Sequence, residues 1–108
     1  MFFDLSLAKL VESIKFGEIL AEDLIVEVYR QIDQYNPSLH IYRSVLPYEI
    51  AVSRARSIDR KIISGEKVGK LCGIPVSVKE NICIRDQYLT NSCGSKILDS
   101  YHSPFNAT

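Results

Sequence analysis

A chain of 108 residues is long enough for one small domain and too short for two. Lys plus Arg equals Asp plus Glu at 13 each, so the net charge indicates neither a nucleic-acid surface nor an anionic membrane as a partner. With 46% apolar and 24% charged residues, the composition is that of a globular protein and excludes a disordered tail.

The first six residues carry no basic segment and no long apolar run. Such a start argues against a signal peptide and against a membrane span. We therefore expect a cytoplasmic chain with no membrane partner.

Two amphipathic helices are predicted next. Apolar residues recur at i, i+3, i+4 and i+7 over residues 5–16 and keep the same spacing over 21–35. Asp4 or Ser6 can cap the start of the first helix, and Gly17 can supply the left-handed residue that stops it. We expect the two helices to form a hairpin with one shared apolar side.

A strand and a third helix are predicted to follow. The Asn36-Pro37 pair should end the second helix, because a residue before proline is pushed out of the α region. β-favouring residues then alternate over 39–46, which predicts a strand. Apolar residues at helical spacing predict a helix over 48–64 that stops at Gly65.

A second strand is predicted over residues 73–79, which read Gly-Ile-Pro-Val-Ser-Val-Lys. Alternation puts Ile74, Val76 and Val78 on one face, because successive strand side chains point to opposite sides. Lys79 then lies at the C-terminal tip of this strand, before a polar turn. The order helix, strand, helix, strand is typical of an α/β layer architecture.

A small polar loop, Leu-Thr-Asn-Ser-Cys-Gly-Ser, occupies residues 89–95. Loops of this kind commonly line a site, since a glycine lets backbone amides approach a ligand closely. Residues 96–101 can then make one or two helical turns.

The cysteines and histidines predict no metal centre. Cys72, Cys83 and Cys93 are odd in number and form no Cys-x-x-Cys pair, so they fit neither a disulfide framework nor a zinc site. We expect them to be reduced and to pack as small apolar residues. His40 and His102 stand alone, without companions at metal-ligand spacing.

Three blocks of sequence carry a resemblance to a known family. They are Gly-Ile-Pro-Val-Ser-Val-Lys-Glu-Asn at 73–81, Thr-Asn-Ser-Cys-Gly-Ser-Lys-Ile-Leu at 90–98 and Pro-Phe-Asn-Ala-Thr at 104–108. Together they resemble the start of the amidase signature family, whose first block reads Gly-[Ile/Val]-Pro-hydrophobic-x-hydrophobic-Lys-[Asp/Glu]-Asn. The later blocks look most like its branch of A-type subunits of glutamyl-tRNA(Gln) and aspartyl-tRNA(Asn) amidotransferases.

The resemblance implies an α/β fold. In it, an N-terminal helical hairpin, residues 5–35, precedes the first strands and helix of a mixed sheet within residues 39–108. Residues 1–108 are then expected to be the truncated N-terminal part of a single amidase domain.

The resemblance also implies a catalytic triad of serine, cis-serine and lysine, in which Lys79 matches the lysine. The lysine acts as general base on a bridging serine, which activates the nucleophilic serine that attacks an amide carbonyl. In the family both serines lie further along than residue 108, and Ser77, Ser92 and Ser95 do not match their positions. No other residue is therefore assigned to the triad.

The polar loop resembles the family's segment near the substrate pocket. Thr90, Ser92, Gly94 and Ser95 are accordingly expected to hold substrate or to orient the catalytic lysine.

The function implied is that of a subunit that hydrolyses glutamine and supplies ammonia for converting Glu-tRNA(Gln) to Gln-tRNA(Gln). The implied partners are B- and C-type subunits, with tRNA bound through a partner. ATP and magnesium are expected on a partner subunit, and no cofactor in this chain. The isolated chain is expected to be inactive. Two alternatives stay open: a fragment of a stand-alone amidase that hydrolyses a small carboxamide, and a non-catalytic split-gene product or interaction fragment.

Overall fold

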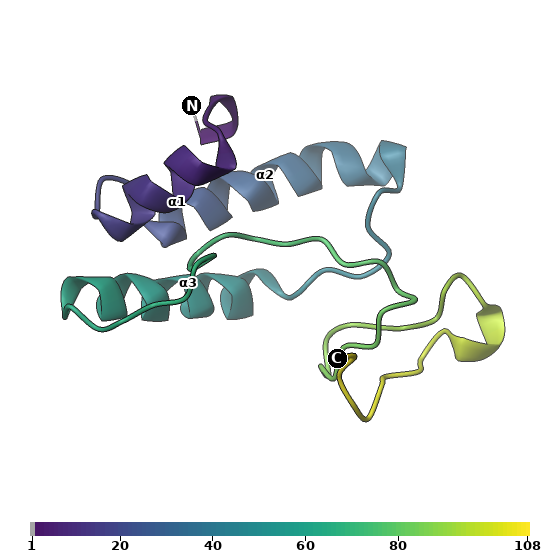
Figure 1. The fold of residues 1–108 in the computed structure, drawn as a ribbon. Coiled ribbons are helices and arrows are strands. Elements are labelled where there is room, and N and C mark those ends of the chain that lie inside the picture. The colour runs from purple at the N-terminus through teal and green to yellow at the C-terminus, as the bar shows by residue number, and fades with distance from the viewer. Residues whose placement is uncertain (1) are drawn as a thin grey trace.

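The computed structural model describes residues 2–108, and its regular elements are all helical (Figure 1). In chain order they are the 3-10 turn η1 (Phe2–Asp4), α1 (Leu7–Lys15), α2 (Ala21–Leu39), α3 (Tyr48–Ile63) and the 3-10 turn η2 (Lys96–Leu98). Figure 1 shows α1 folded back on α2, with α3 running beside α2. After α3 the chain returns along the helices as an extended segment and ends in an irregular lobe that contains η2.

Local sequence signals set the bounds of α1 and α3. The Lys9 amide donates to the Ser6 hydroxyl oxygen at 3.2 Å, so Ser6 is the N-cap of α1. Gly17 and Gly65, with φ of 75° and 77°, follow α1 and α3 in the left-handed conformation. Both helices and both stops confirm the predictions.

The second helix is longer than predicted, because it continues through Pro37 to Leu39. The prediction that the Asn36-Pro37 pair ends it is wrong. The end falls instead at His40, whose φ of 51° is left-handed and whose amide donates to the Asn36 carbonyl at 2.8 Å. The Asn36 side chain also accepts from the Tyr42 amide at 2.8 Å and donates to the Tyr42 carbonyl at 3.1 Å. These bonds stabilise the last turn, which offsets the donor that proline lacks.

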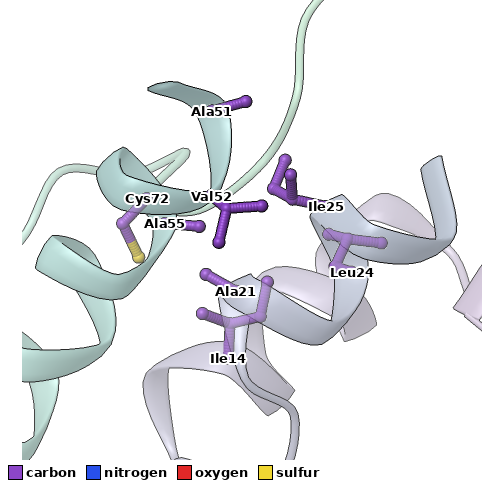
Figure 2. Close-up of a cluster of buried hydrophobic side chains, with 8 residues drawn as sticks. All are labelled: Ile14, Ala21, Leu24, Ile25, Ala51, Val52, Ala55 and Cys72. Carbon is purple, nitrogen blue, oxygen red and sulfur yellow. The ribbon is translucent and has the colours of Figure 1, made fainter. Parts of the chain in front are cut away.

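The apolar core lies where the start of α2 meets α1 and α3. Buried alanines on both α2 and α3 have small side chains, which lets the two helices approach closely. Figure 2 shows Ala21 of α2 turned toward Val52 and Ala55 of α3, with Cys72 beside α3. The core residues are Ile14, Ala21, Leu24, Ile25, Ala51, Val52, Ala55 and Cys72.

The three cysteines differ in their surroundings, although all are free. Cys72 is buried in the core, which confirms the packing role predicted for it. Cys83 is partly buried and Cys93 is exposed. The prediction of a packing role is therefore wrong for Cys93, which lies on the polar loop.

A glycine brings the extended segment against the helices. Gly73 has a φ of 75°, and a Cβ at this position would lie 2.8 Å from the Cβ of Ala21. A real Cβ does not approach so closely, so only glycine lets the chain pass the start of α2 here.

The strands predicted over 39–46 and 73–79 do not form, and residues 2–108 contain no sheet. The predicted α/β fold is therefore seen only as helices and extended segments. The physical reason is that a strand needs a neighbour to receive its backbone hydrogen bonds, and neither segment finds one. A bond of 3.0 Å from the Ser77 hydroxyl to the Tyr42 phenol oxygen links the two segments without a ladder. Apolar side chains stay exposed, such as Val76 at 68%.

Candidate functional site

The candidate catalytic lysine lies at the end of the extended segment that begins at Gly73. Lys79 is exposed, and its carbonyl accepts the Ile82 amide at 3.0 Å. This bond closes a tight turn over residues 79–82, which we call the lysine turn. Within residues 2–108 the Lys79 ammonium makes no ion pair or hydrogen bond. The amine is thus placed at a fixed turn but is open to solvent.

An open groove of about 1400 Å³ runs beside this lysine. Its walls come from α2, α3, the connection between them, and the extended segment, and Lys79, Thr90 and Gly94 lie along it. At the helical end, Tyr29 of α2 donates to the Leu46 carbonyl, and its ring meets that of Tyr48 edge to face at a centroid distance of 5.5 Å. The groove is large enough for a small substrate or a peptide segment.

The residue after the lysine organises the polar loop. Glu80 Oε1 accepts the Thr90 hydroxyl at 2.9 Å, while Oε2 accepts the Ser92 hydroxyl at 2.8 Å and the Cys93 amide at 2.8 Å. Arg43 adds an ion pair, with its Nε 3.7 Å from Oε2. One carboxylate therefore joins the lysine turn, the polar loop and the connection between α2 and α3.

The charge of Glu80 is stabilised by these neighbours. Partial burial raises the pKa of Glu80, but the hydrogen bonds from Ser92, Thr90 and the Cys93 amide, together with the Arg43 charge, lower it by more. The net result is a pKa below the usual value for glutamate. The carboxylate is accordingly ionised at neutral pH.

Asn91 fixes the backbone of the lysine turn. Its side-chain amide donates to the carbonyls of Glu80 at 3.2 Å and Ile82 at 2.9 Å, and its Oδ1 accepts the Ile84 amide at 3.4 Å. Asn91 and Ser92 are among the most buried polar residues of the chain, at 7% and 1% exposure. Their hydrogen bonds offset the cost of that burial.

The outer end of the polar loop turns back on itself. Cys93 and Gly94 both have left-handed backbone, with φ of 51° and 80°, and the Ser95 amide donates to the Ser92 carbonyl at 2.9 Å. A Cβ at Gly94 would lie 3.2 Å from the guanidinium of Arg43. Glycine therefore gives Arg43 room to reach Glu80.

The last residues of the chain pack against the same region. The Ala107 amide donates to the Cys83 carbonyl at 2.8 Å, and the Arg85 amide donates to Asn106 Oδ1 at 2.7 Å. Two of the blocks noted in the sequence, 73–81 and 104–108, are therefore brought close together by the short segment that follows the lysine turn.

The structure brings Lys79 and the polar loop together, but through a residue that the sequence analysis did not single out. The hydroxyls of Thr90 and Ser92 both donate to the Glu80 carboxylate. Gly94 and Ser95 follow them in the loop. Substrate binding by these four residues stays a prediction. The sequence signal that could have found Glu80 is its place directly after the lysine, in a motif that requires an acidic residue there.

Comparison with known proteins identifies the family of the chain. The family model described as Amidase matches residues 23–108. The chain belongs to the amidase signature family.

Curated relatives show which members of the family the chain is similar to. The chain is 36% identical to the A-type subunit of glutamyl-tRNA(Gln) amidotransferase from Natranaerobius thermophilus over 105 residues, which are 97% of this chain and 21% of the relative. It is 41% identical to the protein of the same name from Trichodesmium erythraeum over 88 residues, which are 82% of this chain and 18% of the relative. The chain thus spans about a fifth of the length of these relatives. No solved structure matches it.

Two further features can be stated for residues 2–108. No helix there is both long and apolar enough to cross a bilayer. No three side chains of histidine, cysteine, aspartate or glutamate gather there in a way that could hold a metal ion.

Proposed function

We propose that this chain is the lysine-bearing part of the A-type, glutamine-hydrolysing component of an amidotransferase. The observation that carries the proposal is the Gly-Ile-Pro-Val-Ser-Val-Lys-Glu-Asn block at 73–81, inside a family match that covers residues 23–108. The printed name shared by the relatives supports the amidotransferase branch. Lys79 is the general base of the proposed serine, cis-serine and lysine triad.

Hydrolysis of glutamine by this triad requires an unprotonated lysine amine beside a serine hydroxyl. Lys79 would take the proton of the bridging serine, which would in turn take the proton of the nucleophilic serine as it attacks the amide carbonyl of glutamine. The attack forms an acyl-enzyme and releases ammonia, and water then frees glutamate. A lysine in water is protonated at neutral pH, so the base must be covered by protein to do this work.

The remaining parts of the reaction fall to other components. Ammonia would pass to a B-type subunit, which with ATP and magnesium converts Glu-tRNA(Gln) to Gln-tRNA(Gln), while a C-type subunit completes the assembly. Contact with tRNA would be made by the partner. This division fits the neutral net charge of the chain, which favours no nucleic-acid surface of its own.

A second candidate is a stand-alone amidase that acts on a small carboxamide. The open groove beside Lys79 favours it, because its walls are largely apolar and would accept a small apolar amide. A third candidate, a non-catalytic interaction fragment, is favoured by the apolar side chains that the extended segment leaves exposed, Val76 and Val78 among them.

A chimera tests these candidates. Residues 1–108 replace the matching segment of the Trichodesmium erythraeum relative, which is co-produced with its own partner subunits, and ammonia release is measured with glutamine and with small apolar carboxamides. We expect turnover of glutamine, and a loss of about 10²–10⁴-fold in kcat for Lys79→Ala, as for the removal of a general base. Lys70→Ala removes another exposed lysine before the block and should keep full activity.

Each candidate predicts a different outcome. Faster turnover of apolar carboxamides than of glutamine would favour the stand-alone amidase. A folded chimera that turns over neither substrate would favour the interaction fragment. Full activity of Lys79→Ala would contradict both enzymatic assignments.

A further inference from the structure

We propose that Glu80 is a positioning residue for Lys79, and that it acts by fastening the lysine turn to the polar loop of residues 89–95. The inference rests on the proposed function, because it assigns a role to the neighbour of the proposed base. It goes beyond the proposed function because it assigns a role to residues other than Lys79: Thr90 and Ser92 hold the Glu80 carboxylate.

The carboxylate of Glu80 is largely occupied by hydrogen bonds and a nearby positive charge. A carboxylate offers about four lone-pair sites. Three of them accept hydrogen bonds of 2.8–2.9 Å from Thr90, Ser92 and the Cys93 amide, and Arg43 lies 3.7 Å from Oε2. Glu80 therefore serves as a fixed acceptor that holds the polar loop.

The lysine turn is held on both its side-chain and its main-chain side. The side chain of Glu80 is bound as described, while its carbonyl accepts the Asn91 amide group at 3.2 Å. Within the turn the Ile82 amide donates to the Lys79 carbonyl at 3.0 Å. The backbone of Lys79 is thus fixed from the residue that follows it, and the direction from which the lysine side chain leaves the chain is set.

The cluster favours a carboxylate over an amide. In Glu80→Gln the NH₂ group takes the place either of Oε1, where it meets only the Thr90 hydroxyl, or of Oε2, where it meets the Ser92 hydroxyl and the Cys93 amide. The first arrangement keeps the bonds from Ser92 and Cys93, but to a neutral oxygen, and such bonds are about half as strong as bonds to a carboxylate. The second leaves the Cys93 amide without its acceptor. The substitution also removes the charge that Arg43 faces.

The first experiment measures the fastening itself. Amide hydrogen exchange is followed by NMR in the full chain, at the amides of Cys93 and Ile82, whose bonds depend on the cluster. Glu80→Gln should speed exchange at both by about tenfold, because an opening that was costly becomes easier. Glu27→Gln is the matched control. Glu27 is a carboxylate on α2 with 15% side-chain exposure against 17% for Glu80, and its substitution should leave both amides unchanged.

The second experiment asks whether the fastening serves Lys79. In the amidotransferase chimera, Glu80→Gln should lower kcat for glutamine by about 10- to 100-fold with a change in KM of less than about twofold, since a misplaced base slows chemistry without weakening substrate binding. Glu27→Gln should change neither constant. Thr90→Val removes one donor to Oε1 and keeps the shape, so it should lower kcat in the same direction by about threefold, which tests the cluster even if Glu80→Gln does not fold.

The outcomes separate this inference from the proposed function. Full activity of Lys79→Ala would end the proposed function, and this inference with it. If Lys79→Ala is inactive but Glu80→Gln and Thr90→Val keep kcat, the function stands and the positioning role is overturned. A rise in KM at unchanged kcat would also overturn it, because it would assign the cluster to substrate binding.

Discussion

Asp59 of α3 caps the first turn of α2, where its Oδ1 accepts the Ala21 amide at 2.7 Å and its Oδ2 accepts the Glu22 amide at 3.0 Å. Asp59 is only 9% exposed, and the residue at the N-cap position itself, Leu20, supplies no side-chain bond. An ion pair of 2.7 Å between Arg56 and Glu22 lies beside the cap. The two long helices are therefore joined by polar bonds at the edge of the apolar core.

Removal of this cap should destabilise the chain. Asp59→Ala leaves the buried Ala21 amide and the partly buried Glu22 amide without their acceptor, so we expect a loss of about 1–3 kcal/mol in the free energy of unfolding. Asp59→Asn keeps one acceptor oxygen and should lose less. Urea unfolding followed by circular dichroism measures both, with Glu49→Ala in the first turn of α3 as the control. Equal midpoints for Asp59→Ala and the control would contradict the capping role.

Gly73 should be more sensitive to alanine than Gly17 and Gly65, the left-handed glycines that follow α1 and α3. Gly73, Gly17 and Gly65 have similar φ of 75–77°, but only the Cβ at Gly73 would meet another atom, the Ala21 Cβ at 2.8 Å. The backbone strain is therefore shared, at about 1–2 kcal/mol, and the clash is particular to Gly73. We expect Gly73→Ala to lower the free energy of unfolding by about 1–3 kcal/mol more than Gly17→Ala does, as for overpacking of a core. Equal losses in a urea titration would show that the segment can move away from α2.

The features that were predicted correctly from the sequence depend on residues close together in the chain. The helix periodicities, the Ser6 cap and the stops at Gly17 and Gly65 all depend on neighbours within a few positions, and the structure confirms them. Lys79 was predicted at the tip of a strand, but residues 73–79 form no strand, and the lysine follows an unpaired extended segment instead.

Most of the errors come from dependence on distant residues. The strand predictions failed because pairing needs a partner strand that residues 2–108 do not supply. The end of α2 was misplaced for a nearer reason, since Asn36 bonds to Tyr42 across the turn that follows the helix. Neither the cap by Asp59 nor the ion pair of Arg43 with Glu80 has a local signal, since each joins residues far apart in the sequence.

Acid should destabilise the chain through its glutamates. The Arg30 hydrogen bond, with help from Gln31, lowers the pKa of Glu27 to about 2, and the pKa of Glu80 also lies below its usual 4.5. A carboxyl whose folded pKa is depressed contributes stability above its unfolded pKa and loses it as the pH falls through the folded value. The urea midpoint should therefore fall as the pH drops from about 4.5 toward 2.

Variants identify the source of this acid sensitivity. Glu27→Gln and Glu80→Gln should each flatten the dependence of the urea midpoint on pH in that window, because the titrating group is gone. The contribution of Glu27 to the pH dependence of the urea midpoint should also be smaller in high salt, because its partner Arg30 is mostly exposed. If both variants kept the full acid dependence, other carboxylates would be its source.

The chain by itself should not hydrolyse amides. Lys79 is exposed in residues 2–108, and the nearby hydroxyls are engaged elsewhere, that of Ser77 with Tyr42 and that of Ser92 with Glu80. General-base catalysis needs a serine hydroxyl within hydrogen-bond reach of the amine, and the hydroxyls of Ser77 and Ser92 are bound to other partners. Purified residues 1–108 should release no more ammonia from glutamine than Lys79→Ala does, while the chimera should be active. Ammonia release by the purified chain that disappears in Lys79→Ala would mean that these residues carry their own nucleophile, and the assignment of the serines to sequence beyond them would have to be abandoned.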